Sequence, residues 1–547
     1  MFCGPAERLC LPALFLADNR FKPGIYDLGF ARFISNELSG HLKCNRMIMK
    51  KNMMACVLLA LAGVLMPVGS SASDGFADES RNTVRILEGD NSDPSIVRHG
   101  DAYYLVHSSF VYTPGLVVYK SYDLVNWTYC STALNHFAGD VWAPDIVVHN
   151  GRFYIYFPTL SSHGKTSMVT WADSPEGPWS EPVDLNVGGI DPEHVVDGDG
   201  RRWLLMSSGD MYPLTADGCK ISGKPVSVYK GWPIPEDWDI ESFSMEGLNV
   251  KKVGDYYYMF AAEGGTAGPP TSHMVVEARS KSVFGPWENA PFNPLLRTQS
   301  RDERWWSKGH GSVVDTPDGR LFMIFHAYEN GFQTLGRQTL LRELELKDGW
   351  LRLKDGDISL PSPAVKKVWG IGDFVWQTCR ENDIRERFDI KPGKIVMKSK
   401  GKSPAEGSPL LARASAHKYE IEACLTLKGE GASAGLVAYY DERFHFGYGF
   451  SRDGLLRYRR GQVSRAVSKC SEACRTGRLW LRMRSDHDVL SAWYSADGKT
   501  WHKFPWGFEV SGVHHNTVYG FLSLRPGLYA GGDGEVEVTD FKLTVTD

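Results

Sequence analysis

The stretch DPSIVRHGDAYYLVHSS, residues 93–109, decides the fold, because four similar stretches follow it along the chain. Each has a short apolar segment, a turn with Gly, Asn or Asp, and a second segment rich in aromatic residues. This pattern is typical of a β-hairpin. The other four are PDIVVHNGRFYIYFPT from residue 144, DPEHVVDGDGRRWLLMSS from 191, EGLNVKKVGDYYYMFAAE from 246 and HGSVVDTPDGRLFMIFHA from 310.

Equivalent positions in these units recur at a nearly constant spacing. Tyr103 and Phe153 are 50 residues apart, and so are Phe153 and Trp203. One four-stranded blade of a β-propeller takes about 40–50 residues, and no long amphipathic helical pattern interrupts the units. The sequence therefore predicts an all-β protein with a five-bladed β-propeller at residues 85–343. The alternative, a β-sandwich of similar length, would not repeat at this period.

The first residues of the five units suggest where the chemistry lies. They are Asp93, Asp145, Asp191, Glu246 and His310, and the inner strand of a propeller blade starts near the central channel, so we expect these side chains to converge. Converging carboxylates repel one another and burial penalises their charged forms, which makes the set costly as structure alone.

Such a set suits glycoside hydrolysis, which needs one protonated carboxyl and one ionised carboxylate beside the scissile bond. The protonated group donates to the leaving oxygen, and the ionised group activates water or attacks the sugar. Opposite sides of a propeller channel leave room for a sugar and a water. That geometry predicts inversion, with a carboxyl separation of roughly 6.5–9.5 Å.

In these motifs the chain resembles glycoside hydrolase family 43, a group of β-xylosidases, α-L-arabinofuranosidases and arabinanases. The resemblance covers roughly residues 91–343. It is specific because several motifs occur in the family's order. They are DPSIVRHGDAYYL, SYDLVNW, VWAPDIV, IDPEHVVDGDG, MEGLNV, GHGSVVDTPDG and LGRQT.

The resemblance implies a role for each matching residue. Asp93 is implied as the general base, Glu246 as the general acid, and Asp191 as the carboxylate that orients the acid and adjusts its pKa. Asp145 is implied as a further substrate-binding carboxylate of the pocket. Arg337 is implied as a donor to substrate hydroxyls, with a surface ion pair as the alternative.

His310 and several aromatic residues complete the predicted site. In similar enzymes the histidine faces the central channel and holds an ordered water or a metal ion, often calcium, whereas a lone histidine is otherwise a satisfied core residue. No other cofactor is expected. Trp142 and Phe110 are predicted sugar platforms, with packing as the alternative. Further aromatic candidates for the pocket are Tyr112, Trp305 and Trp306.

The C-terminal part is predicted to form a second all-β domain. After a connector at 344–384, short alternating segments such as KYEIEACLTL and SAGLVAYY predict a two-sheet β-sandwich at 385–547. Its YSADGKTW and GLYAGG elements resemble the concanavalin-like C-terminal domain of many family 43 xylosidases. That resemblance implies a domain that packs on the propeller and closes part of the active-site mouth. A detached carbohydrate-binding module and a purely stabilising domain are the alternatives.

The N-terminal residues predict export. Lys50 and Lys51 precede an apolar run at 53–68 and a small-residue cleavage site at 70–72, which predicts a signal peptide at 47–72. The run is too short for a membrane span. Residues 1–46 are predicted to be a non-native extension from an upstream start codon, and the mature protein is predicted to be secreted or periplasmic. A net charge of −4 provides no basic surface for nucleic acid.

These features together predict an inverting, exo-acting enzyme whose partner is a carbohydrate. It would release terminal β-D-xylosyl or α-L-arabinofuranosyl units from plant polysaccharide fragments. The alternatives are an endo-arabinanase or galactosidase of the same family, a retaining fructan enzyme, and a carbohydrate-binding propeller without turnover.

Overall fold

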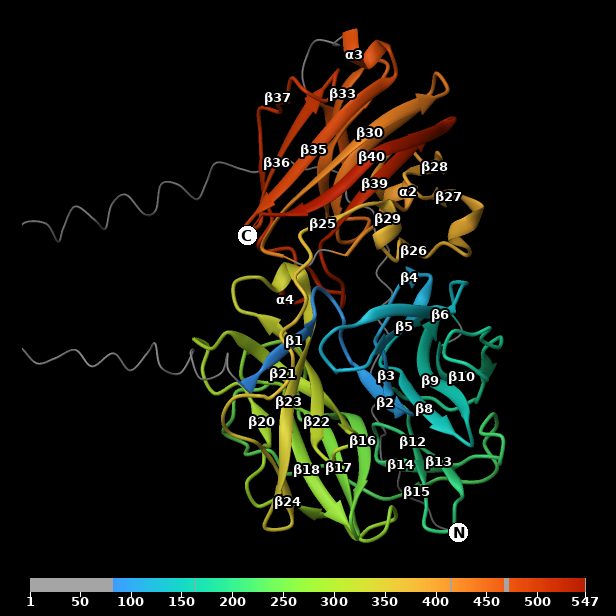
Figure 1. The fold of residues 1–547 in the computed structure, drawn as a ribbon, viewed down its shortest axis with the longest axis vertical. Coiled ribbons are helices and arrows are strands. Elements are labelled where there is room, and N and C mark those ends of the chain that lie inside the picture. The colour runs from blue at the N-terminus through green and yellow to red at the C-terminus, as the bar shows by residue number, and fades with distance from the viewer. Residues whose placement is uncertain (1–81, 163, 414–415, 467–471, 547) are drawn as a thin grey trace, which may run out of the picture. The chain divides into compact units, whose positions relative to one another are not determined.

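The computed structural model describes residues 82–546 except 163, 414–415 and 467–471. The predicted extension and signal peptide therefore lie outside the described residues. Strands dominate the described part, and its α-helices are single turns such as α2 (Pro404–Gly407) and α3 (Glu472–Arg475), which confirms the all-β class (Figure 1). Within those residues, no helix has the length and apolar character needed to cross a membrane.

Antiparallel sheets of four or five strands make up residues 84–353, which we call the five-sheet region. In each of its five sheets, one repeated hairpin unit supplies two adjacent strands. The first sheet holds β2 (Ser95–His99), β3 (Ala102–Val106), β5 (Gly115–Ser121) and β6 (Thr128–Leu134); the second holds β7 (Asp140–Val141), β8 (Asp145–His149), β9 (Arg152–Ser161), β10 (Gly164–Ala172) and β11 (Val183–Asp184); the third holds β12 (Glu193–Val196), β13 (Arg202–Leu205), β14 (Asp210–Pro213) and β15 (Val226–Ser227); the fourth holds β16 (Met245–Val253), β17 (Tyr256–Glu263), β18 (Met274–Ser280), β19 (Glu288–Asn289) and β20 (Leu296–Arg297); the fifth holds β1 (Val84–Leu87), β21 (Trp305–Asp315), β22 (Leu321–Glu329), β23 (Arg337–Lys347) and β24 (Trp350–Leu353).

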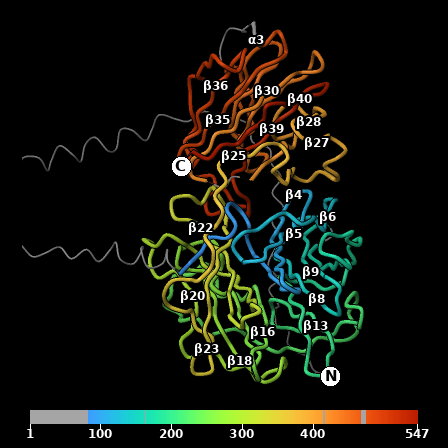
Figure 2. The backbone as a smooth tube through the Cα atoms, in the orientation of Figure 1, coloured from blue at the N-terminus to red at the C-terminus, as the bar shows by residue number. Residues whose placement is uncertain are grey.

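The fifth sheet contains the two ends of this region. β1 pairs antiparallel with β23, with Val84 opposite Leu341. In Figure 2 the blue start of the described chain accordingly meets the yellow-green strands of the last sheet. The pairing ties the first strand of the region to the last sheet.

A ring of hydrogen bonds links the unit-opening strands of the five sheets. In every sheet a polar side chain accepts a backbone N–H from a neighbouring sheet, and the last bond returns to the first sheet. The five bonds run from Ile146 to Ser95 Oγ (3.1 Å), from His194 to Asp145 Oδ2 (2.8 Å), from Val250 to Glu193 Oε1 (2.9 Å), from Val313 to Asn249 Oδ1 (3.0 Å) and from Ile96 to Ser312 Oγ (3.3 Å).

Apolar clusters fill the seams between successive sheets, because consecutive residues of one strand point to opposite faces. In β17, for example, Met259 packs toward the third sheet and Phe260 toward the fifth. Each cluster holds buried residues of both adjoining sheets, for example Val118 and Phe157, Tyr156 and Leu204, Leu205 and Met259, Phe260 and Phe325, and Ile324 and Leu105.

The C-terminal part forms a two-sheet sandwich, as predicted, but its strands span residues 368–545 and so begin inside the predicted connector at 344–384. One large apolar cluster lies between its sheets. Ile421 and Leu481 contribute from one sheet, and Leu436 and Phe450 from the other. The nine-stranded sheet holds β25 (Val368–Trp369), β27 (Phe388–Lys391), β28 (Lys394–Lys398), β30 (Lys418–Lys428), β35 (Arg478–Asp486), β36 (Val489–Ser495), β37 (His502–Lys503), β38 (Phe508–Glu509) and β40 (Glu535–Val545); the six-stranded sheet holds β29 (Leu410–Leu411), β31 (Ala432–Tyr439), β32 (His445–Ser451), β33 (Gly454–Arg459), β34 (Gln462–Arg465) and β39 (Arg525–Gly532).

The sandwich contacts the five-sheet region through backbone and side chains. β26 (Thr378–Cys379) pairs with β4 (Tyr112–Thr113). Arg525 of the sandwich lies 3.5 Å from the ring centre of Tyr112 and 3.7 Å from a carboxylate oxygen of Asp90. In the helix α4 (His515–Val518), the Asn516 amide donates to the carbonyl oxygen of Gly268 at 3.2 Å. The segment around α4 is thereby held against the five-sheet region.

Candidate active site

A cavity of about 150 Å³ brings most of the predicted site residues together. Asp93, Asp191, Glu246 and His310, from the starts of four repeated units, all line it. Its remaining walls are Phe110, Trp142, Ala143, Ile190, Glu241, Ser242, Ser244, Gly265, Thr266, Arg337 and Phe521. Tyr112, Trp305 and Trp306 do not line this cavity.

Backbone conformation at the strand starts aims these side chains. Asp93, Asp191 and His310 have φ values of 54°, 53° and 57°, in the left-handed region that side-chain-bearing residues rarely adopt. Such conformations cost about 1–3 kcal/mol each and cluster at functional sites. In the fourth sheet Gly247 takes this conformation instead, with φ 54°, so Glu246 lies one residue earlier. A Cβ on Gly247 would lie 2.8 Å from His310 Nδ1.

Asp93 is held as an ionised carboxylate. Arg337 donates to both of its oxygens, at 2.8 and 3.2 Å, and the Ser108 hydroxyl donates to Oδ2 at 2.5 Å. Burial alone would raise the pKa of this carboxyl, but the Arg337 guanidinium and the neighbouring histidines outweigh it and hold the pKa well below its ordinary value. Asp93 can therefore accept a proton at neutral pH.

Glu246 has the opposite character. Its side chain is 25% exposed into the cavity, and its Oε1 lies 4.0 Å from Nε2 of the buried His273. Burial, followed by the negative charge of Asp93, raises the pKa of Glu246 to about 7. Glu246 can therefore keep and donate a proton near neutral pH, as a general acid requires.

The pKa of Asp191 is raised, as that of Glu246 is, whereas that of Asp93 is lowered. Burial and the charges of Glu246 and Asp93 raise its pKa well above the ordinary value. The backbone N–H of Gly247 donates to its Oδ2 at 2.8 Å, which joins Asp191 to the residue that follows the acid. A carboxyl in that position can orient the strand start that carries Glu246.

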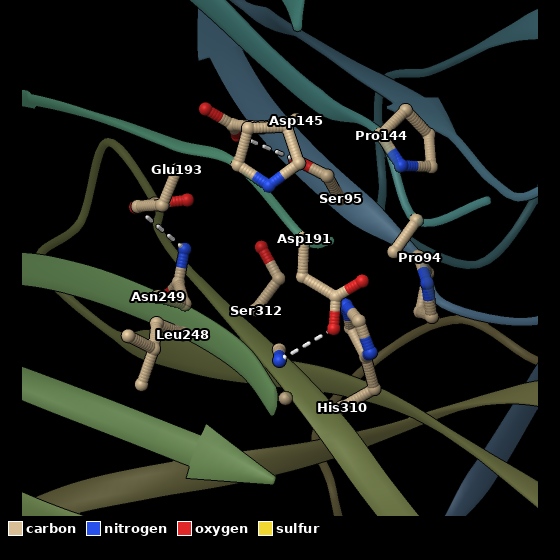
Figure 3. A pocket seen from close by; sticks show the side chains of 14 residues that line it. Pro94, Ser95, Pro144, Asp145, Asp191, Glu193, Leu248, Asn249, His310 and Ser312 are labelled. Carbon is tan, nitrogen blue, oxygen red and sulfur yellow. Dashed lines mark hydrogen bonds between the residues drawn. The ribbon is translucent and has the colours of Figure 1, made fainter. Parts of the chain in front are cut away.

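Asp145 lies outside the cavity that holds the other three carboxyls. It lines a neighbouring small cavity with Glu193, drawn in Figure 3, and belongs to the ring of strand-linking hydrogen bonds. Ser95 Oγ donates to its Oδ1 at 3.0 Å. Burial raises the pKa of Asp145 to about 6. Asp191 and His310 line both cavities, so Asp145 lies behind the site rather than in it.

The aromatic walls come from two parts of the molecule. Phe110 and Trp142, both predicted from the sequence, line the cavity. Phe521 comes from the sandwich, stacks on Phe110 with ring centres 6.2 Å apart, and lies 4.9 Å from the Arg337 guanidinium. No local pattern around Phe521 indicated a site, because it reaches the cavity only through packing of the sandwich.

Two buried histidines beside the carboxyls were also missed. His326 accepts the backbone N–H of Asp93 at Nδ1 over 3.0 Å, and its ring stacks on that of His273 at 5.3 Å. The His273 ring fits only because residue 309 is a glycine, since a Cβ on Gly309 would lie 1.7 Å from Cδ2 of His273. These histidines pack under both Asp93 and Glu246.

The predicted calcium ion has little protein to hold it. Calcium takes about six to eight oxygen ligands. Among the described residues, no three His, Cys, Asp or Glu side chains are arranged to bind one metal ion. Calcium at His310 would therefore depend mainly on water.

Comparison with known proteins identifies the chain. The family model for glycosyl hydrolases family 43 matches residues 83–351, and that for the beta xylosidase C-terminal concanavalin A-like domain matches residues 372–543. A xylan 1,3-beta-xylosidase from a Vibrio species is 31% identical over 425 residues, which cover 66% of this chain and 77% of that one. The chain belongs to glycosyl hydrolase family 43. It is a glycoside hydrolase, as the sequence predicted.

Other members of family 43 match most of the chain. A non-reducing end alpha-L-arabinofuranosidase from Bacteroides ovatus is 29% identical over 539 residues, covering 88% of this chain and 96% of that one. The solved xylan beta-1,4-xylosidase from Bacillus halodurans superposes with a TM-score of 0.74 at 25% identity, covering 85% of this chain and all of that one. The likeness extends over both the five-sheet region and the sandwich.

Proposed function

We propose that this family 43 enzyme hydrolyses glycosidic bonds with inversion, using Glu246 as the general acid and Asp93 as the general base. One observation carries the proposal: two carboxyl groups in one small cavity have pKa values shifted in opposite directions. Two carboxyls whose surroundings separate their pKa values are the pattern of an acid and base pair.

The proposed reaction uses the side chains in turn. Glu246 gives its proton to the leaving oxygen while water attacks the anomeric carbon from the opposite face, and Asp93 accepts a proton from that water. Arg337 and Ser108 hold Asp93 ionised and fixed in direction. Asp191 accepts the backbone N–H of Gly247, next to the acid, and burial together with the charges of Glu246 and Asp93 raises its pKa.

The proposed substrate is a terminal β-D-xylosyl or α-L-arabinofuranosyl unit of a plant polysaccharide fragment. Relatives named as a xylosidase and as a non-reducing end arabinofuranosidase support both sugars. The volume supports exo action, since a cavity of about 150 Å³ holds one six-membered ring. Phe110, Trp142 and Phe521 supply apolar faces for that ring, and Arg337 a donor for its hydroxyls.

We also propose that the five sheets are the blades of a five-bladed β-propeller. Three features support this: the ring of hydrogen bonds between unit-opening strands, the apolar seams between successive sheets, and the pairing of β1 with β23. Export remains part of the proposal as well, supported by the signal-like pattern at residues 47–72.

The function is tested by a substrate screen and by stereochemistry. Nitrophenyl β-D-xyloside, α-L-arabinofuranoside and β-D-galactoside, with arabinan as polymer, should show turnover of one or both of the first two. NMR of the first-formed sugar should show the inverted anomer. A retained anomer, or cleavage of arabinan alone, would overturn the proposal.

A further inference from the structure

A second cavity adjoins the active site and has no role in the chemistry above. It has a volume of about 300 Å³ and lies between the segment 230–236 and the strand start that carries the acid. Ser244 lines both this cavity and the catalytic one. Its other walls are Lys230, Gly231, Trp232, Pro233, Ile234, Glu236, Phe243, Met245 and Glu263.

Strand register places the two cavities on opposite faces of one sheet. Met245 pairs with Glu263 and Glu246 with Ala262, so Met245 and Glu263 share a face while Glu246 points to the other. Glu246 lines the catalytic cavity, and Met245 and Glu263 line the second one. The start of β16 is therefore the wall between them, and Ser244 lies at its end.

The chemistry fixes which part of a substrate lies on this side. In inverting hydrolysis the acid and the attacking water occupy opposite faces of the sugar, so the leaving group departs on the acid's side. Asp93 marks the water side, and Glu246 with the residues just before it marks the leaving side. A chain extending from the scissile oxygen would pass Ser242 and Ser244 toward the second cavity.

The walls of the second cavity have the character of a sugar site. Phe243 is 66% exposed, which leaves its face open to a ligand. Glu263 is 2% exposed; its Oε1 accepts the Trp232 N–H at 2.7 Å, while its Oε2 has no hydrogen-bond partner among the described residues. Burial raises the pKa of Glu263 to about 7, so this carboxyl can also donate to a hydroxyl.

We propose that this second cavity binds the leaving part of the substrate, the one or two sugar residues beyond the scissile bond, with Phe243 as stacking platform and Glu263 as hydrogen-bonding group. The inference rests on the proposed release of terminal xylosyl units. It assigns to residues 230–244 and to Glu263 a preference for oligosaccharides over glycosides with a small leaving group.

The test compares substrates that differ only in the leaving group. β-D-xylosyl fluoride presents no leaving sugar, whereas xylobiose and xylotriose present one and two. In Phe243→Ala, kcat/KM for both oligosaccharides should fall about tenfold, the equivalent of one lost ring contact, while kcat/KM for the fluoride stays within about twofold. Tyr122→Ala, which removes a ring 64% exposed elsewhere, is the matched control and should change neither.

Two substitutions of Glu263 distinguish an effect on oligosaccharide binding from an effect on folding. Glu263→Gln keeps the size and an acceptor for Trp232, and should retain most oligosaccharide activity. Glu263→Met should lower kcat/KM for xylotriose but not for the fluoride. An unchanged xylotriose-to-fluoride ratio in Phe243→Ala and Glu263→Met would overturn the inference and leave the proposed function standing. Failure of the wild type on the fluoride and both oligosaccharides would instead overturn the xylosyl assignment.

Discussion

The five-sheet region and the sandwich are both antiparallel β structures, yet they bury different kinds of side chain. The sandwich places one large apolar cluster between two facing sheets. The five-sheet region divides its apolar residues among the seams and gathers carboxyls, histidines and amides where its unit-opening strands meet. Two facing sheets are filled by apolar side chains, whereas strand starts linked in a ring leave a cavity where carboxyls and a histidine gather beside aromatic walls.

The largest expected effect comes from removing the two carboxyls at that meeting point. Glu246→Ala and Asp93→Asn should each lower kcat/KM for xylobiose by about 10³-fold or more, because each proton transfer contributes about 10²–10⁴-fold. Fluoride leaves without protonation, so β-D-xylosyl fluoride should recover much of the rate in Glu246→Ala but not in Asp93→Asn. Steady-state kinetics on both substrates checks this.

The control is Asp255→Asn, an exposed turn carboxyl between β16 and β17, which should behave as wild type. Equal losses on both substrates in the two active-site variants would contradict the division into acid and base. Wild-type rates in either would show that the polar meeting point is structural, like the core of the sandwich.

The pH profile should show the same division. Glu246 acts protonated and its pKa is about 7, so kcat/KM should fall as the pH rises through about 7. Asp93 acts ionised with a pKa well below its ordinary value, so the acidic limb should lie below about pH 4. In Arg337→Met the acidic limb should move to higher pH, because the cation that favours the carboxylate is gone. An unmoved acidic limb would contradict the role assigned to Arg337.

A smaller effect is expected from Phe521, and it distinguishes the sandwich's contribution to the cavity wall from the packing of the sandwich core. Phe521→Ala should lower kcat/KM about tenfold with little change in unfolding, since it removes one aromatic wall of the cavity. Leu436→Ala, in the sandwich core, should lower the free energy of unfolding by about 2–5 kcal/mol and leave kcat/KM unchanged below the transition. Urea unfolding and kinetics on both variants measure the difference. Loss of activity in folded Leu436→Ala would show that packing inside the sandwich core affects the active site.

Sequence reasoning succeeded where function follows the repeat and stopped where it depends on register or distant packing. Asp93, Asp191 and Glu246 open their units, so the hairpin pattern alone brought them together. Asp145 also lies near a unit start, at the first residue of β8. In the ring of hydrogen bonds between sheets, however, its carboxylate takes the place that Ser95 and Glu193 take in their sheets. Those two residues lie two positions after Asp93 and Asp191. A two-residue shift keeps the same face of a strand but moves the side chain along it, out of the catalytic cavity. Phe521 comes from the sandwich, and no sequence pattern around it indicated a site residue.

The smallest expected effect concerns a buried acid away from the site. Glu277 on β18 is fully buried; its Oε1 accepts the Leu351 N–H at 3.0 Å, and its Oε2 has no hydrogen-bond partner among the described residues. Burial raises its pKa to about 8. Between the unfolded pKa, about 4.5, and about 8 the unfolded chain loses this proton and the folded protein keeps it, so this group makes the free energy of unfolding fall with rising pH.

Glu277→Gln is neutral in both states and removes that dependence. Relative to wild type, the variant should gain about 2 kcal/mol between pH 5 and pH 6.5, measured by urea unfolding at both values. Because Asp191 and Glu193 add pH dependence of the same sign to both proteins, only the difference between variant and wild type reports on Glu277. A Leu436→Ala variant, altered in the apolar sandwich core, should change the free energy of unfolding by the same amount at both pH values. If Glu277→Gln also changed it by the same amount at both, Glu277 would not be a buried protonated acid.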